Sequence, residues 1–389
     1  MPDLPGAVLV DDVLAAIASL RASIAARADE IEQQRHISPD LIAALTAAGC
    51  YRFFSPEWRT GAPTRYGLAL AAISELAMAD ASVAWVVSQS ALGQLILAYL
   101  PAPALETLYH GGPDVRIAGV FAPKGHASQG DGNWTVSGRW PLASGSDAAQ
   151  WIYVQALVTE GRRVVRGPGD QPLTRLVLLP RDEVTIIDTW DAVGLRGTAS
   201  HDIQVEARQR DEHWTCEMTE RDGKGEGLQS VPLMDHAGLL IAAVAVGCAA
   251  GALDEVARIA ASGKRPAFSP RPLASDPVFH VQLGVAHMQL ASARALLEAQ
   301  GRLIECASQG RQLSVVEGRS VRATCHHIAG VAAAVVDTAY TLARSASIGR
   351  TSPLQRRLRD MHTLTQHAWC SSDFPEQLGA TLVSAAVSL

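Results

Sequence analysis

Apolar residues recur at helical spacing through the first and the last parts of the chain. The predicted helices of the first part are Val10–Gln34, Ser38–Gly49, Arg65–Ala79, Ser82–Tyr99 and Pro103–Tyr109. Those of the last part are Val231–Ala261, Pro277–Ser308, Val315–Ala346, Leu354–Trp369 and a short helix from Pro375. Ser38-Pro39 is a typical helix start, and Gly49 can adopt the left-handed conformation that ends a helix. Long helices joined by short Gly- or Pro-bearing breaks indicate a bundle in the last part.

Between these helical parts, from Val115 to about Ala207, the pattern changes to short alternating runs separated by turns. Asp131-Gly132 is a tight hairpin signal between two such runs. The order of helices, strands and helices predicts an α+β fold with three domains. They are an N-terminal helical domain over residues 1–114, a central antiparallel β domain over 115–228, and a C-terminal four-helix bundle over 229–389.

Composition limits the classes of partner. Of the 389 residues, 48% are hydrophobic and 19% charged, which is enough to bury a large core. The net charge of -6, without a dense basic block, argues against nucleic acid and anionic membranes as partners. The cluster around Arg162–Arg166 is read as a solvated hairpin. We found no charged-then-apolar leader and no long uncharged run, so a cytoplasmic protein is expected.

Metal ligation is not expected. The six cysteines are scattered without CxxC pairs, so neither a zinc site nor a disulfide framework is indicated. His362 and His367 lie five residues apart on a predicted helix, which points their side chains about 140° apart and prevents them from sharing one ion.

A polar stripe runs along the predicted helix Leu354–Trp369. Arg356, Asp360, Thr363 and His367 are spaced four, three and four residues apart, so they share one face of a helix that packs in a bundle. Polar residues on such a face indicate a working site.

Two further positions could contribute to a site. Trp85, near the start of a buried helix, can form the wall of a flat pocket or simply fill the core. Ser144-Gly145-Ser146 ends a predicted strand, where two hydroxyls and a glycine allow close approach of a ligand or form an ordinary turn. The loop Gly194–Ser200 contains glycines but lacks the spacing of a phosphate-binding loop.

These segments together carry a family resemblance. SVAW at 82–85, WTVSGRWPLASGS at 134–146, Trp190 with VGLRGTAS at 193–200, and SPLQRRLRDMHTLTQH at 352–367 resemble the acyl-CoA dehydrogenase fold. More narrowly, the chain is similar to the flavin-dependent monooxygenase branch, the oxygenase components of two-component aromatic hydroxylases. The similarity spans nearly the whole chain.

The resemblance implies a reaction and its reactants. Reduced FMN or FAD would come from a separate flavin reductase, since the chain has no GxGxxG after a strand for a nicotinamide cofactor. With O2 as co-substrate, a C4a-hydroperoxyflavin would hydroxylate an aromatic or polycyclic small molecule. His367 would act as the catalytic base, and Ser144 would hydrogen-bond to flavin N5. The family also implies a homotetramer.

The resemblance also implies where the flavin lies, between the β domain and the bundle. Arg265 in Arg265-Pro-Ala-Phe268 would meet a flavin phosphate from the adjacent subunit, or it is a solvated loop residue. The implied cofactor-binding residues are Trp85, Phe121, Ala122, Ala143, Ser144, Gly145, Arg265, Ala346, Ser347, His367 and Ala368.

Three alternatives stay open. An acyl-CoA dehydrogenase-type FAD oxidoreductase needs a carboxylate base, but Ala368 stands where many members carry a glutamate. An N- or S-oxygenase would share the fold, and Ala148 replaces a histidine that many phenol hydroxylases of this branch carry. A non-catalytic member kept for assembly would bind no flavin tightly.

Overall fold

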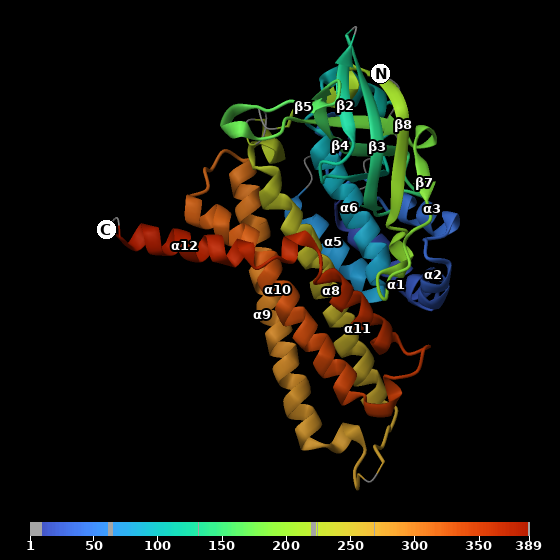
Figure 1. The fold of residues 1–389 in the computed structure, drawn as a ribbon. Helices are drawn as coiled ribbons and strands as arrows, with labels where there is room; N and C mark the ends of the chain where they lie inside the picture. Colours follow the sequence, from blue (N-terminus) through green and yellow to red (C-terminus); the bar gives the residue numbers. More distant parts are fainter. Residues whose placement is uncertain are drawn as a thin grey trace.

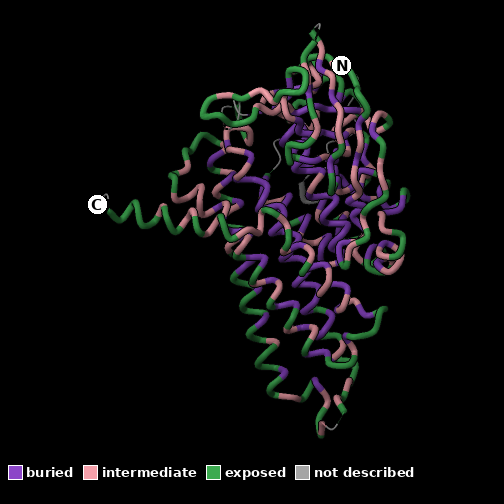
Figure 2. Tube along the Cα trace, in the orientation of Figure 1, coloured by how far each residue is buried: buried purple, intermediate pink, exposed green. Residues whose placement is uncertain are grey.

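The computed structural model describes residues 10–60, 65–130, 132–218, 223, 225–267 and 269–387. Helices come first, strands occupy the middle, and long helices follow (Figure 1). The sheet lies at one end of the molecule, and the long helices extend away from it (Figure 1). Buried residues run continuously from the helices beside the sheet into the bundle (Figure 2).

The N-terminal helices closely follow the predicted pattern. They are α1 (Val10–Ala26), α2 (Ala28–Gln34), α3 (Pro39–Ala47), α4 (Glu57–Thr60), α5 (Tyr66–Ala79), α6 (Ala81–Leu97) and α7 (Ala102–Leu108). The predicted helix Val10–Gln34 is two helices divided at Arg27, whose guanidinium binds Glu30, Ser38 and Asp40. Gly49 has a φ of +80° after α3, as expected for a residue that ends a helix.

The strands form one sheet. They are β1 (Ile117–Val120), β2 (His126–Gly130), β3 (Asn133–Ala143), β4 (Trp151–Glu160), β5 (Arg163–Val164), β6 (Thr174–Pro180), β7 (Thr185–Ile187), β8 (His201–Asp211) and β9 (Thr215–Cys216). Their order is β7-β8-β3-β2-β4-β6-β9, with β1 and β5 also paired to β4.

Most of these strand pairs are antiparallel, as predicted, but β1 and β2 run parallel to β4. The predicted hairpin joins β2 to β3, because Gly130 pairs with Asn133 across a turn that contains Gly132 at a φ of +81°. Asp131 lies outside the described residues. The final pair of β3 and β8 is Ala143 with His201, so the end of β3 lies beside the segment that precedes β8.

The C-terminal helices are α8 (Leu233–Ala261), α9 (Pro277–Ser308), α10 (Val315–Leu342), α11 (Pro353–Leu364) and α12 (Asp373–Val387). Asp276 caps α9, and a capping box of Ser314 and Glu317 starts α10. Among the described helices, α8 has the length and apolar composition of a membrane span, but its most apolar 18-residue window is entirely buried within the fold.

The predicted helix Leu354–Trp369 is too long. Helix α11 ends at Leu364, and the short 3-10 helix η8 (Ala368–Cys370) follows after a turn. His367 precedes η8 with an extended backbone at φ -70° and ψ 146°. His367 therefore leaves the stripe shared by Arg356 and Asp360, which are both buried in α11.

Candidate active site

Trp85, Ser144 and His367 meet in space although they are far apart in the sequence. The indole Nε1 of Trp85 donates to Ser144 Oγ at 3.0 Å. The His367 ring lies edge-on to the Trp85 ring, with centroids 5.2 Å apart and planes at 74°. Three of the sequence-predicted site residues therefore form one group, contributed by α6, the end of β3 and the segment after α11.

Helix α6 places Trp85 through a buried cap. Asp80 Oδ1 accepts from the backbone N–H of Val83 at 3.0 Å, satisfying one of the free donors at the start of the helix. Trp85 lies one turn further along and is only 5% exposed. A buried indole N–H usually has a hydrogen-bond partner, and Ser144 supplies it here.

A chain of hydroxyls fixes the orientation of Ser144. Ser144 Oγ lies 2.7 Å from Ser200 Oγ, which lies 2.6 Å from Thr198 Oγ1. Thr198 Oγ1 in turn donates to the carbonyl of Leu195 at 2.8 Å. Because the Thr198 proton is committed to that carbonyl, the Ser200 proton points to Thr198 and the Ser144 proton points to Ser200. Ser144 Oγ therefore acts as an acceptor toward Trp85 and toward any ligand at this place.

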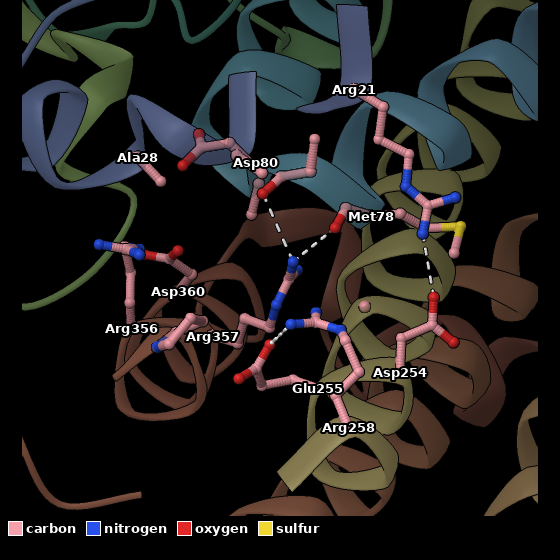
Figure 3. A pocket seen from close by; sticks show the side chains of 15 residues that line it. Arg21, Ala28, Met78, Asp80, Asp254, Glu255, Arg258, Arg356, Arg357 and Asp360 are labelled. Carbon is pink, nitrogen blue, oxygen red and sulfur yellow. Dashed lines mark hydrogen bonds and ion pairs between the residues drawn. The ribbon is translucent and has the colours of Figure 1, made fainter. Parts of the chain in front are cut away.

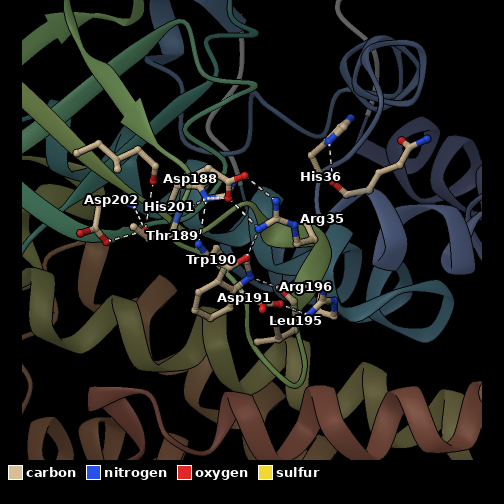
Figure 4. A network of polar contacts seen from close by, with 12 residues as sticks. Arg35, His36, Asp188, Thr189, Trp190, Asp191, Leu195, Arg196, His201 and Asp202 are labelled. Atoms are coloured by element: carbon tan, nitrogen blue, oxygen red, sulfur yellow. Dashed lines mark hydrogen bonds and ion pairs between the residues drawn. The ribbon is translucent and has the colours of Figure 1, made fainter.

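The segment before β8 is fastened to α2 (Figure 4). The Arg35 guanidinium binds both carboxylate oxygens of Asp188, at 2.8 and 2.7 Å, and the carbonyl of Trp190 at 2.8 Å. His201 Nδ1 accepts the backbone N–H groups of Thr189 and Trp190 at 3.2 and 3.1 Å. These contacts hold the loop that carries Leu195, Thr198 and Ser200.

The same loop is fastened to α11 on its other side. The backbone N–H of Leu195 donates to Asp360 Oδ1 at 2.6 Å. A Cβ at Gly194 would lie 2.2 Å from the carbonyl oxygen of Arg359, so only glycine permits this close approach. The spacing of the glycines argues against a phosphate-binding loop here, but it does not reveal this docking role, because the partner residue is more than 160 positions away.

Asp360 lies in a buried polar cluster (Figure 3). Burial, followed by the nearby Asp80 carboxyl, raises the pKa of Asp360 to about 7. The Arg357 guanidinium donates to the backbone carbonyls of Ala77 and Met78 at the end of α5. The cluster lines a cavity of about 240 Å³ and joins α11 to α5 and α6.

His367 is uncharged at neutral pH. Burial lowers the pKa of its imidazole to about 4. Its Nδ1 accepts the backbone N–H of Trp369 at 3.4 Å, which places the ring proton on Nε2. That distance is long for a hydrogen bond, so the opposite tautomer is also accessible to the ring.

The predicted residues beside this group differ in exposure. Ala143 and Gly145 are buried at the end of β3, and a Cβ on Gly145 would lie 2.9 Å from Val86 Cγ1. Phe121, which follows β1, is 39% exposed. Ala122 and Ala368 are also exposed. These exposed side chains are accessible to a ligand.

The remaining predicted residues lie elsewhere in the chain. Arg265 is exposed in the connection between α8 and α9, and Phe268 lies outside the described residues. Ala346 ends the 3-10 helix η7 (Arg344–Ala346), and the buried Ser347 follows it. The connection between α8 and α9 lies at the end of the bundle away from the sheet (Figure 1), and α9 alone spans roughly 48 Å. One chain does not bring Arg265 to Ser144.

Within the described residues, no group of three or more His, Cys, Asp or Glu side chains is arranged to hold a metal ion. The polar atoms around Ser144 are hydroxyls, an indole N–H and backbone groups, which suit an uncharged organic ring better than a cation.

Comparisons with known proteins identify the family of the chain. Residues 239–372 match the family model described as acyl-CoA dehydrogenase, C-terminal domain. The chain is 33% identical over 356 residues to indole-3-acetate monooxygenase of Pseudomonas putida, covering 91% of this chain and 89% of that protein. It is 28% identical over 368 residues to the flavin-dependent monooxygenase oxygenase subunit HsaA of Rhodococcus jostii (strain RHA1), covering 90% and 92%.

A solved structure shows the same architecture. The crystal structure of 3-HSA hydroxylase from Rhodococcus sp. RHA1 superimposes with a TM-score of 0.87 at 26% identity, covering 97% of each chain.

The helices, sheet and bundle define a protein of the acyl-CoA dehydrogenase fold. Within that fold, the chain belongs to the flavin-dependent monooxygenases, as an oxygenase component of a two-component system. Its cofactor is reduced flavin, which a separate reductase supplies, and O2 is the co-substrate.

Proposed function

We propose that this enzyme hydroxylates a fused-ring aromatic small molecule beside Trp85, Ser144 and His367. The observation that carries the proposal is the contact of Trp85 with both Ser144 and His367. The bicyclic indole named in the relative of 33% identity supports a substrate of this size. If the enzyme instead oxidises an amine nitrogen or a sulfur of its substrate at the same site, the identity of the product would show it.

The hydroxyl chain supports a reduced flavin beside Ser144. N5 of a reduced flavin carries a hydrogen, and Ser144 Oγ is an acceptor with its own proton committed to Ser200. Ala143, Ser144 and Gly145 would hold the ring, with Phe121, Ala122 and Ala368 at its edges. When bound, the flavin supplies the activation of O2. FMN and FAD both satisfy this arrangement.

His367 would act on the substrate as a neutral imidazole. In this state Nε2 can donate a hydrogen bond to an oxygen of the substrate, and the alternative tautomer can accept a proton through Nε2. The Trp85 ring holds the imidazole from one side, which limits its orientation. We assign it the role of catalytic base.

We also propose that the enzyme is a homotetramer in the cytoplasm. Arg265 lies at the end of the bundle away from the sheet (Figure 1), and Ala346 and Ser347 are predicted to contact the same flavin. In an assembly, these residues of a second subunit would reach the phosphate end of the flavin. Helix α9 supports such an assembly, because Val278, Val281, Val285 and Met288 expose an apolar face.

The test compares two histidines close in sequence. Reduced FMN or FAD is mixed with O2 and a panel of phenols, fused-ring aromatics and amines, and both product and hydrogen peroxide are measured. We expect His367→Ala to lower product formation about 100-fold or more, with peroxide formed instead. His362→Ala is the control, since His362 is exposed and binds Asp337 at the surface. Equal product from wild type and His367→Ala would refute the proposed role of His367.

A further inference from the structure

Two cysteines face each other directly behind the His367 segment. Cys325 lies on α10, and Cys370 is the last residue of η8. Their sulfur atoms are 3.7 Å apart. Cys325 is fully buried, whereas Cys370 is partly exposed. A small displacement of either side chain would bring the two sulfurs within bonding distance.

The backbone of Cys370 connects this pair to the site. The carbonyl of Cys370 accepts from His326 Nδ1 at 2.8 Å, so two consecutive residues of α10 hold Cys370. The N–H of Cys370 donates to the carbonyl of His367 at 2.8 Å. A displacement of Cys370 is therefore passed to His367 through one hydrogen bond.

The surroundings determine which cysteine moves. Cys325 lies against α8, where a Cβ at Gly238 would be 3.2 Å from the Cys325 Cβ. This close helix packing leaves Cys325 little freedom. Cys370 belongs to a three-residue helix between two turns, so it is the cysteine that would approach its partner.

We propose that Cys325 and Cys370 are an oxidation site, at which hydrogen peroxide forms an intramolecular disulfide that displaces the His367 segment and lowers hydroxylation. Hydrogen peroxide is what a reduced flavin and O2 yield when no substrate takes up the oxygen atom. The disulfide would thus respond to turnover without substrate. The formation of the disulfide does not depend on the proposed substrate class.

The reaction balances with peroxide as the oxidant. The thiolate of Cys370 attacks one oxygen of hydrogen peroxide, so an S–O bond forms, the O–O bond breaks and water leaves after protonation. Cys325 then attacks the Cys370 sulfur, the S–O bond breaks, and the hydroxide leaves as water with the Cys325 proton. The two thiols lose two protons and two electrons in total, and one peroxide becomes two waters.

The electrostatics support Cys370 as the first nucleophile. The hydrogen bond between the two sulfur atoms lowers the pKa of Cys370 below its ordinary value and, together with burial, raises the pKa of Cys325. The thiolate is the reactive form toward peroxide. Cys370 is also the more accessible of the two.

The disulfide can be mapped by peptide mass spectrometry. Trypsin places Cys325 in the peptide 323–344 and Cys370 in the peptide 360–389, with no other cysteine in either. After exposure to hydrogen peroxide, or turnover of reduced flavin without substrate, remaining thiols are blocked with an alkylating agent before digestion. We expect a cross-linked pair of these peptides that dithiothreitol separates and that catalase prevents in the turnover sample.

Three variants complete the test. Cys370→Ser should abolish the cross-link and remove the loss of product formation caused by peroxide. In Cys325→Ser, dimedone should capture a sulfenic acid on Cys370. Cys306→Ser is the control, because Cys306 is exposed on α9 and should leave the cross-link intact.

Measurements of product formation test the second part of the proposal, that the disulfide displaces the His367 segment and lowers hydroxylation. Product formation should fall in proportion to the cross-linked fraction and recover with dithiothreitol. Absence of the cross-link at peroxide levels that oxidise Cys306 would overturn the proposal, and full product formation by the cross-linked enzyme would overturn its effect on His367. Peptide mapping requires no substrate, so its failure is distinguishable from failure of the proposed hydroxylation.

Discussion

The charge of His367 is determined by its surroundings in the fold. The Trp85 ring and neighbouring atoms shield much of the imidazole from water, so the charged form loses hydration. The resulting pKa of about 4 is below the ordinary histidine value of about 6.5. The ring is therefore neutral throughout the physiological range.

This charge state can be measured directly. With ¹³C-labelled histidine, the His367 ring signal, assigned by its loss in His367→Gln, should remain that of a neutral imidazole from about pH 8 to about pH 5. Because the unfolded chain binds the proton more readily, the His367 contribution to stability should be lost as the pH falls from about 6.5 through about 4. A titration midpoint near 6.5 would contradict this burial effect.

The residues around Ser144 differ in whether the sequence alone could identify them. Trp85, Ser144 and His367 lie in short segments whose residue types already indicate chemistry. Thr198 and Asp360 act through contacts that join distant segments. The carbonyl of Thr198 accepts the N–H of Gly145, and the Asp360 carboxyl accepts the N–H of Leu195. The polar stripe marked Asp360 as a candidate, but nothing in the sequence pairs it with the backbone of Leu195, or Thr198 with Gly145.

At the scale of elements, the loop before β8 links three parts of the fold. Arg35 holds it to α2, Asp360 holds it to α11, and Ser200 connects it to Ser144 at the end of β3. Leu195 and Ala199 take positive φ values of 49° and 45°, conformations that the surrounding contacts must stabilise. The position of Ser144 therefore depends on α11.

Asp360 provides a test of this dependence. Asp360→Leu should lower the free energy of unfolding by about 1–3 kcal/mol, because the buried Leu195 N–H loses its acceptor. The same variant should raise the fraction of O2 released as peroxide, since the Ser144 hydroxyl chain loosens. Asp360→Asn retains an acceptor oxygen and should preserve both properties.

The pH dependence separates the charge of Asp360 from its hydrogen bond. The raised pKa means that the folded protein favours the protonated carboxyl, so its contribution is present at low pH and lost as the pH rises through about 7. Denaturant unfolding of wild type at about pH 6 and about pH 8.5 should show this loss, and Asp360→Asn should not. Equal pH dependence of the two proteins would exclude Asp360 as its source.

The element boundaries show a related limit of the sequence. Met361, Leu364 and Ala368 continue the helical spacing, and no Gly or Pro lies between Leu364 and His367, so the pattern predicted a helix through Trp369. The structure ends α11 at Leu364, where the contacts of Cys370 with α10 redirect the chain. The bundle helices with clear caps, such as α9 after Asp276, were predicted closely.

At the scale of the whole molecule, two parts of the predicted flavin site lie far apart. One is centred on Ser144 beside the sheet, and the other is Arg265 in the connection between α8 and α9, at the opposite end of the bundle (Figure 1). The exposed apolar face of α9 offers a way to bring these parts together between subunits.

Substitution of this face tests the assembly. Val278, Val281, Val285 and Met288 are 54–65% exposed and lie on one side of α9 by their spacing. The double variant Val281→Glu, Met288→Glu should shift the mass measured by light scattering toward the monomer, because it buries two charges in the proposed contact. Its affinity for reduced flavin should fall with the mass, since Arg265 of the second subunit is lost.

The control is His287→Glu, because His287 is exposed on another side of α9. This variant should retain both the mass and the flavin affinity of the wild type. If the double variant keeps the mass of the wild type, α9 is not the subunit contact. If the variant is a monomer that binds reduced flavin as tightly as the wild type, Arg265 is not part of the flavin site.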